Sequence, residues 1–205
     1  MKVILLNGSP KSKGCTYTAL KIIENELINE GIKVKFYEVG NKPVIGCTGC
    51  TACRKLGKCV HDDLVNEVSK EIESADGFIV GSPVHYAAAS GAATSFLDRL
   101  FYSTDKNQLR HKFGASIVSC RRGGASATFD QLNKYFTINE MPIVSSVYWN
   151  QIHGNTPEEV VQDLEGVRTM KVLARNMAYL IKCKEAAKNV PLPKLVPVER
   201  TNFIR

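Results

Sequence analysis

Short apolar runs alternate with amphipathic stretches along the chain, and the alternation repeats five times. The apolar runs predict buried strands at Val3–Leu6, Val34–Val39, Gly77–Val80, Ala115–Ser119 and Ile143–Val147. The stretches that follow them carry apolar residues at helical spacing, which predicts helices at Thr16–Glu30, Asp62–Ser74, Gly91–Tyr102, Ala127–Asn139 and Thr156–Cys183. This repetition indicates an α/β fold in which helices cover both faces of a five-stranded parallel sheet.

Several helix boundaries carry a signal of their own. Gly31 is placed to end the first helix, because glycine readily takes the left-handed conformation found there. Asp62 and Asp63 stand where the second helix begins, near its positive end. Thr156 is the expected N-cap of the last helix, with Pro157 at its first position.

Length and charge limit the classes of protein to consider. The 205 residues suit one domain, expected over residues 1–188 with a Cys-rich loop at 44–60, and a Pro-rich tail at 189–205. The net charge of +7 comes from scattered basic residues, so we expect a basic surface that attracts small anions and no nucleic-acid partner. No apolar run approaches the roughly 20 residues of a membrane helix, and no secretory signal is visible. A cytoplasmic location is therefore expected, where the seven cysteines stay reduced or bind metal.

The loop after the first strand has the composition of a phosphate site. It joins the apolar run directly to a helix, whose first N–H groups and dipole favour an anion. Ser9, Ser12 and Thr16 offer hydroxyl groups, and Lys11 adds positive charge. The loop lacks both the nucleotide-triphosphate and the dinucleotide fingerprints. A monophosphate site, usually occupied by flavin mononucleotide (FMN), is predicted; a plain turn without ligand is the alternative.

Two further loops follow the third and fourth strands, and all three loops should meet at the carboxyl edge of the sheet, where α/β proteins bind ligands. Gly123 and Gly124 permit close approach of a flat ligand, and Tyr86 offers an aromatic face. Arg121 or Arg122 would place positive charge near the N1/O2 edge of a flavin. An ordinary surface loop and a solvated arginine pair are the alternatives.

Four cysteines lie close together in the long loop between the second strand and the second helix. Two, two and five residues separate Cys47, Cys50, Cys53 and Cys59. A Cys-x2-Cys-x2-Cys start is typical of compact [4Fe–4S] sites, whereas a four-cysteine zinc site usually has two separated pairs. Free thiols also satisfy the pattern.

The remaining cysteines have simpler interpretations. Cys120 and Cys183 are expected to be buried small residues. Cys15 is expected to start a helix and not to act as a nucleophile.

The three loops together resemble the NAD(P)H-dependent FMN reductase family and its iron–sulfur flavoprotein branch, which have flavodoxin-like folds. The resemblance implies a three-layer sandwich with strand order 2-1-3-4-5, a flavodoxin-like FMN-binding domain over residues 1–188, and non-covalent FMN. Many members have asparagine where Cys15 stands. The cysteine spacing is similar to the cluster motif of iron–sulfur flavoproteins. By resemblance, the phosphate would be held by Ser9, Lys11, Ser12, Gly14, Cys15 and Thr16, and the ring by Pro83, Val84, His85, Tyr86, Ser119, Arg121, Arg122, Gly123 and Gly124.

We therefore expect an FMN-dependent oxidoreductase that passes electrons from NAD(P)H to a quinone, flavin or other small acceptor, with no catalytic side chain. The alternative is an iron–sulfur flavoprotein that carries electrons from ferredoxin through a [4Fe–4S] cluster. The family resemblance implies a homodimer or homotetramer. Asp98 and Arg99 are expected either at a subunit interface or at a solvated helix end. Trp149 and His153 either line a substrate pocket or are a packed aromatic and a surface histidine.

Overall fold

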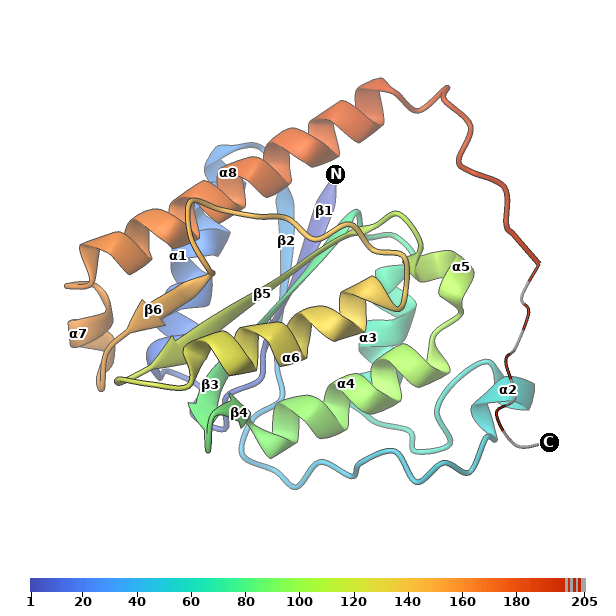
Figure 1. Ribbon diagram of the computed structural model, residues 1–205, viewed down its shortest axis with the longest axis horizontal. Coiled ribbons are helices and arrows are strands. Elements are labelled where there is room, and N and C mark those ends of the chain that lie inside the picture. The colour runs from blue at the N-terminus through green and yellow to red at the C-terminus, as the bar shows by residue number, and fades with distance from the viewer. Residues whose placement is uncertain (198, 200, 202, 204–205) are drawn as a thin grey trace.

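A computed structural model describes residues 1–197, 199, 201 and 203. Five parallel strands form its central sheet, which lies in the middle of the molecule (Figure 1). The sheet has the order β2-β1-β3-β5-β6. A two-residue strand, β4, pairs antiparallel with the end of β3. The strands are β1 (Lys2–Asn7), β2 (Lys33–Glu38), β3 (Gly77–His85), β4 (Ala88–Ala89), β5 (Phe113–Cys120) and β6 (Gln151–His153).

Helices cover both faces of the sheet and produce three layers (Figure 1). The first face carries α1 (Cys15–Asn29) and α8 (Leu164–Ala186), and the second carries α3 (Leu64–Ile72), α4 (Gly91–Ser103) and α6 (Ala125–Thr137). Three short helices complete the described residues: α2 (Cys53–Leu56), α5 (Lys106–Leu109) and α7 (Pro157–Val160). Among these helices none combines the length and the apolar character needed to cross a membrane.

The alternation of side chains along β1 explains the two layers of core. Val3 and Leu5 pack with α1 and α8, whereas Ile4 and Leu6 pack on the opposite face against α3, α4 and α6. Successive strand residues point to opposite faces, so a strand covered on both sides must be apolar at every position. The predicted α/β fold and its three-layer, flavodoxin-like architecture are confirmed.

The fifth parallel strand lies later in the chain than the sequence predicted. Within 143–147, Ile143 makes a single bridge to Gly114, while the strand proper is Gln151–His153. Between them the Ser146 hydroxyl donates to the side chain of Asn150 (2.7 Å), and the Asn150 amide donates to the Ser116 carbonyl (3.0 Å). These side-chain bonds compete with ladder pairing, so regular pairing with β5 begins only at its carboxyl end.

The predicted last helix is two helices. Thr156 caps the first of them as expected, with its side chain accepting from the Glu159 N–H. The chain then leaves helical geometry, because the Asp163 carboxylate accepts from the backbone N–H of Gly166 (2.9 Å) and of His153 (2.7 Å). Asp163 thus becomes a second N-cap and starts α8. Gly31, at a φ of +78°, follows the end of α1 as predicted.

Candidate functional site

Hydrogen bonds bring the three predicted loops together at the carboxyl edge of the sheet. The Ser90 hydroxyl, at the start of α4, donates to the Gly8 carbonyl (2.6 Å), and the Gly8 N–H donates to Gly81 (2.8 Å). Thr16 and Ser119 share a hydrogen bond between their hydroxyl groups (2.7 Å). These bonds connect the strand ends and helix starts that flank the loops after β1, β3 and β5.

The first loop leads into α1 without a side-chain cap. Gly14 is the N-cap residue and offers no side chain, so the first N–H groups of the helix lack the usual partner. Ser9 is buried and its hydroxyl accepts from the Lys11 N–H (3.1 Å), whereas Lys11 and Ser12 are exposed. This arrangement is the one in which helix N-termini bind phosphate.

Cys15 occupies the first position of α1 and is not an activated thiol. Its sulfur contacts the carbonyl of Gly154, at 3.6 Å. Burial raises the pKa of this thiol, which disfavours the nucleophilic thiolate. The expectation that Cys15 is a helix-start residue therefore agrees with its surroundings.

The second loop is a tight hairpin with an unusual turn. Tyr86 and Ala87 connect β3 to β4, and both have positive φ, +52° and +58°. Two-residue hairpins with this conformation normally contain Asn-Gly or similar pairs, because a Cβ makes left-handed backbone costly. Tyr86 is fully exposed. His85 beside it is exposed as well, while Pro83 and Val84 are half-buried. The turn therefore displays the aromatic ring of Tyr86 to solvent on a left-handed backbone.

The third loop packs against this hairpin through Gly124. Its φ is +91°, and a Cβ there would lie 2.8 Å from both the Val84 side chain and the Ala87 backbone. Only glycine therefore lets the two loops approach so closely. Arg121, Arg122 and Gly123 are exposed, and neither arginine side chain makes an ion pair within the described part of the chain.

The four cysteines of the long loop line one cavity. Around it the backbone takes positive φ at Gly49, Thr51 and Gly57, which folds the loop back on itself, and α4 closes one side with Arg99, Tyr102 and Ser103. No three His, Cys, Asp or Glu side chains among the described residues are placed to hold a single metal ion. All four cysteines are free thiols: Cys47, Cys50, Cys53 and Cys59.

The surroundings of Cys50 favour its ionised form. Its pKa is lowered, chiefly by the backbone N–H of Ala52 and next by the Thr48 hydroxyl. A thiolate is the form of cysteine that binds metal.

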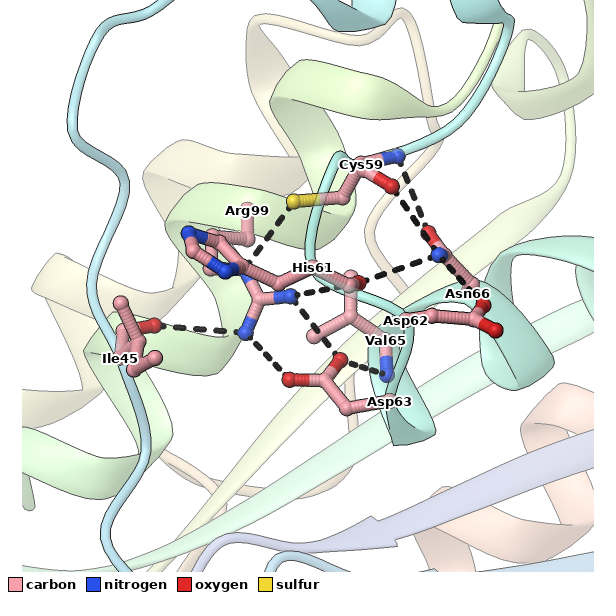
Figure 2. Close-up of polar contacts among 8 residues, drawn as sticks. All are labelled: Ile45, Cys59, His61, Asp62, Asp63, Val65, Asn66 and Arg99. Carbon is pink, nitrogen blue, oxygen red and sulfur yellow. Dashed lines mark hydrogen bonds and ion pairs between the residues drawn. The ribbon is translucent and has the colours of Figure 1, made fainter.

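Arg99 connects the cysteine loop to the core (Figure 2). Its side chain is only 1% exposed and makes two hydrogen bonds to Asp63, at 2.7 and 2.9 Å. It also donates to the carbonyls of Ile45 (3.4 Å) and His61 (3.2 Å), and its Nε lies 3.3 Å from the Cys59 sulfur. Arg99 is therefore not at a solvated helix end, whereas Asp98 beside it is exposed and accepts a hydrogen bond from the Tyr135 hydroxyl. The subunit interface expected at these two residues stays a prediction. The buried ion pair of Arg99 was not anticipated from the sequence.

Other candidate residues have mixed outcomes. Cys120 is buried as predicted, but Cys183 is exposed, because it lies on the solvent side of α8. Trp149 is half-exposed and packs edge-on against Tyr148. His153 contacts the Asp163 carboxylate at 3.3 Å.

Together the doubly covered parallel sheet and the three joined loops at its carboxyl edge define a flavodoxin-like protein. The chain belongs to the NADPH-dependent FMN reductase family, whose model matches residues 1–156. It is 32% identical to an iron–sulfur flavoprotein of Methanocaldococcus jannaschii, over 89% of this chain and 98% of that protein.

Solved structures agree on the fold. An archaeal flavodoxin superimposes with a TM-score of 0.61 at 16% identity, over 89% of this chain and 99% of the flavodoxin. The flavoenzyme NAD(P)H:acceptor oxidoreductase FerB of Paracoccus denitrificans gives 0.64 at 15% identity, over 89% and 97%. The family resemblance predicted from the loops is confirmed, and the protein is a flavin oxidoreductase of the NAD(P)H-dependent class.

Proposed function

We propose that FMN binds across the three joined loops, with its phosphate at the start of α1. The observation that carries this proposal is the uncapped first turn of α1 beside the buried Ser9 and Thr16. FMN in this position would accept a hydride at N5 from NAD(P)H and release electrons to a second substrate. The residues proposed to hold it are Ser9, Lys11, Ser12, Gly14, Cys15, Thr16, Pro83, Val84, His85, Tyr86, Ser119, Arg121, Arg122, Gly123 and Gly124.

In this proposal the protein's own residues bind the FMN and orient its ring. Gly124 lets the second and third loops close into one cradle, which a Cβ would push apart. The exposed ring of Tyr86 is placed to stack on a flat ligand. Arg121 and Arg122 carry positive charge on the same edge and stabilise negative charge on a bound ring. No side-chain acid or base is needed for hydride transfer.

The strained turn supplies a direct test of this assignment. Replacing Ala87 by glycine should stabilise the FMN-free protein by about 1 kcal/mol, because a left-handed alanine is relieved. The FMN dissociation constant should stay unchanged. Tyr86→Asn should relieve similar strain but weaken FMN binding by about tenfold, since the stacking ring is lost. Urea unfolding and fluorescence titration with FMN measure the two quantities. Equal FMN affinity in both variants would show that Tyr86 does not contact FMN.

We propose that a [4Fe–4S] cluster binds at Cys47, Cys50, Cys53 and Cys59, the four thiols of the cysteine cavity. The four thiols line one space, and the Cys-x2-Cys-x2-Cys spacing is typical of a multi-iron cluster and less typical of a four-cysteine zinc site. Ser103 lines the same space, and its hydroxyl oxygen is buried without a hydrogen-bond partner among the described residues. The similarity to proteins named iron–sulfur flavoproteins supports the same interpretation. A cluster here would store one electron at a time.

Two routes for electrons follow from these two sites. In the first, NAD(P)H reduces the protein and a quinone, flavin or other small acceptor reoxidises it at the same loops. In the second, electrons come from ferredoxin by way of the cysteine loop. The exposed basic residues Arg54, Lys55 and Lys58 on that loop favour the second route for an acidic partner protein.

The deciding experiment begins with protein purified without oxygen. Its absorption spectrum, with iron and acid-labile sulfide assayed on the same sample, tests both cofactors, and about four irons per chain are expected. Stopped-flow reduction then compares NADH, NADPH and reduced ferredoxin as donors. Bleaching by a nicotinamide alone supports the first route, and bleaching by ferredoxin alone supports the second. Absence of bound flavin after reconstitution with FMN would overturn the proposed function.

Residues 1–188 are proposed to form the complete folding domain. The last helix ends at Ala186, and residues 189–197 form no helix or strand. A chain ended after residue 188 should unfold at the same urea concentration as the full protein.

A further inference from the structure

We propose that one face of α4 supplies the hydrogen bonds that set the reduction potential of the cluster, from Arg99 and Ser103. This inference rests on the cluster proposed above. Arg99 and Ser103 are four residues apart on the helix, so their side chains share a face. Both line the cysteine cavity.

Arg99 is a donor with a fixed direction. Its two terminal nitrogens are held by Asp63, at 2.7 and 2.9 Å, and this fork leaves Nε facing the Cys59 sulfur at 3.3 Å (Figure 2). The guanidinium is buried and stays charged at any physiological pH. A sulfur that accepts from a buried cation holds extra negative charge more easily.

Ser103 is a second donor, because its hydroxyl has no other hydrogen-bond acceptor among the described residues. It is 8% exposed, and its oxygen finds no partner within the described residues. A buried hydroxyl without a partner costs free energy. Because the Ser103 hydroxyl lacks a partner beside the four thiols, we infer that it donates to an acceptor bound in the cavity. A cluster sulfide or a coordinating cysteine sulfur is such an acceptor.

Both donors act in the same direction on the redox equilibrium. A bound cluster that took one electron from reduced ferredoxin would become more negative while the ferredoxin is oxidised, and no bond would form or break. Hydrogen bonds to the sulfurs and a nearby cation stabilise the more negative form, which raises the reduction potential. Arg99 and Ser103 thus stabilise the more negative form of the cluster by hydrogen bonds, and neither binds iron.

Ser103→Ala is the mildest test. Because the lost hydroxyl has no partner, the metal-free variant should melt at or above the temperature of the wild type. In the iron-loaded protein, the one-electron reduction equilibrium should shift toward the oxidised cluster by about fivefold, the value of one ordinary hydrogen bond. Redox titration followed by electron paramagnetic resonance measures this shift without any assay of activity.

Arg99→Gln tests the charged donor, and Arg54→Gln is its matched control. Arg54 lies next to Cys53 but is exposed and bonds the Tyr102 hydroxyl, at 3.2 Å. Arg99→Gln should shift the equilibrium by about tenfold or more, which is 59 mV for one electron. Arg54→Gln removes the same charge from the loop surface and should leave the potential near the wild-type value.

The outcomes separate this inference from the proposed function. If the wild-type protein binds no iron, the proposal that it holds a cluster is wrong. Iron-loaded Ser103→Ala and Arg99→Gln proteins with wild-type potentials would overturn the role of α4 while leaving the cluster intact. If Arg99→Gln does not fold, the Ser103→Ala titration decides alone, and an unchanged potential overturns the proposal.

Discussion

Replacing Cys50 and Cys53 together by serine should lower the bound iron from about four atoms per chain to near zero. Cys50 is exposed and Cys53 half-buried, so the substitutions remove thiolate ligands without opening the core. The environment of Cys50 already favours its thiolate. The metal-free variant should retain the fold and bind FMN, because the three loops proposed to hold FMN follow β1, β3 and β5 and do not include these cysteines.

Cys183→Ser is the matched control for this pair. It removes an exposed thiol from the end of α8, outside the cysteine cavity, and should keep all of the iron. Iron and sulfide assays on anaerobically reconstituted protein give the comparison. Full iron content in the double variant would show that the iron is held elsewhere.

The second large effect is expected at Asp63, where alanine should destabilise the protein by about 3 kcal/mol. Asp63 is the counter-charge of the buried Arg99, and removing one partner of such a pair leaves a buried cation uncompensated. The same carboxylate also accepts from the Val65 N–H and caps α3, at 3.0 Å. Because the Asp63 side chain is 44% exposed, water repays part of the loss, which places the estimate at the low end for buried pairs.

Asp62→Ala is the control for Asp63, since the two residues are neighbours with the same charge. Asp62 is exposed and faces Lys58 at 3.7 Å, so its loss should change the free energy of unfolding by no more than about 0.5 kcal/mol. Urea denaturation of both metal-free variants measures the difference. Equal destabilisation by the two substitutions would contradict a special role for the Asp63–Arg99 pair.

The pair also gives a pH dependence with a defined sign. Burial opposes ionisation of Asp63, but hydrogen bonds from Arg99 and the Val65 N–H outweigh it, so the pKa lies below its ordinary value of 3.8. The unfolded chain therefore takes up this proton first as the pH falls. The contribution of Asp63 is complete above its unfolded pKa of about 3.9 and is lost as the pH falls through the lower folded value. Below that range, wild type and Asp63→Ala should converge in stability.

The sequence predicted the sheet and its covering helices well, because their signals are local. Val3–Leu6 is apolar throughout, as a strand buried on both faces must be. The fifth strand was misplaced because 143–147 is as apolar as a strand, yet Ser146 and Asn150 form a hydrogen-bonded turn instead. No residue pattern predicts such a turn, because it depends on a hydrogen bond from the Asn150 side chain to the Ser116 carbonyl, which lies in a strand far away in the sequence.

In the two candidate sites as well, features set by neighbouring residues could be predicted from the sequence, and features set by contacts between distant residues could not. The three loops were recognisable from their glycines and hydroxyls, but the left-handed Tyr86–Ala87 turn was not, because tyrosine and alanine do not favour it. Arg99 follows Phe96 by three residues and precedes Ser103 by four, so helical spacing places it on the buried side of α4. Its partner Asp63 is 36 residues away, and only the folded chain reveals the pair.

The contacts that shape the cysteine loop have a consequence for how the protein matures. Arg99 holds Ile45, Cys59 and His61, and Asn66 exchanges hydrogen bonds with the backbone of Cys59 at 3.0 Å in both directions. These bonds join protein to protein and require no iron. The cysteine loop should therefore take its shape when α3 and α4 dock, before the proposed cluster is delivered, and it should keep that shape if oxygen destroys the cluster. Damage of that kind then calls for reloading of the existing chain and not for synthesis of a new one.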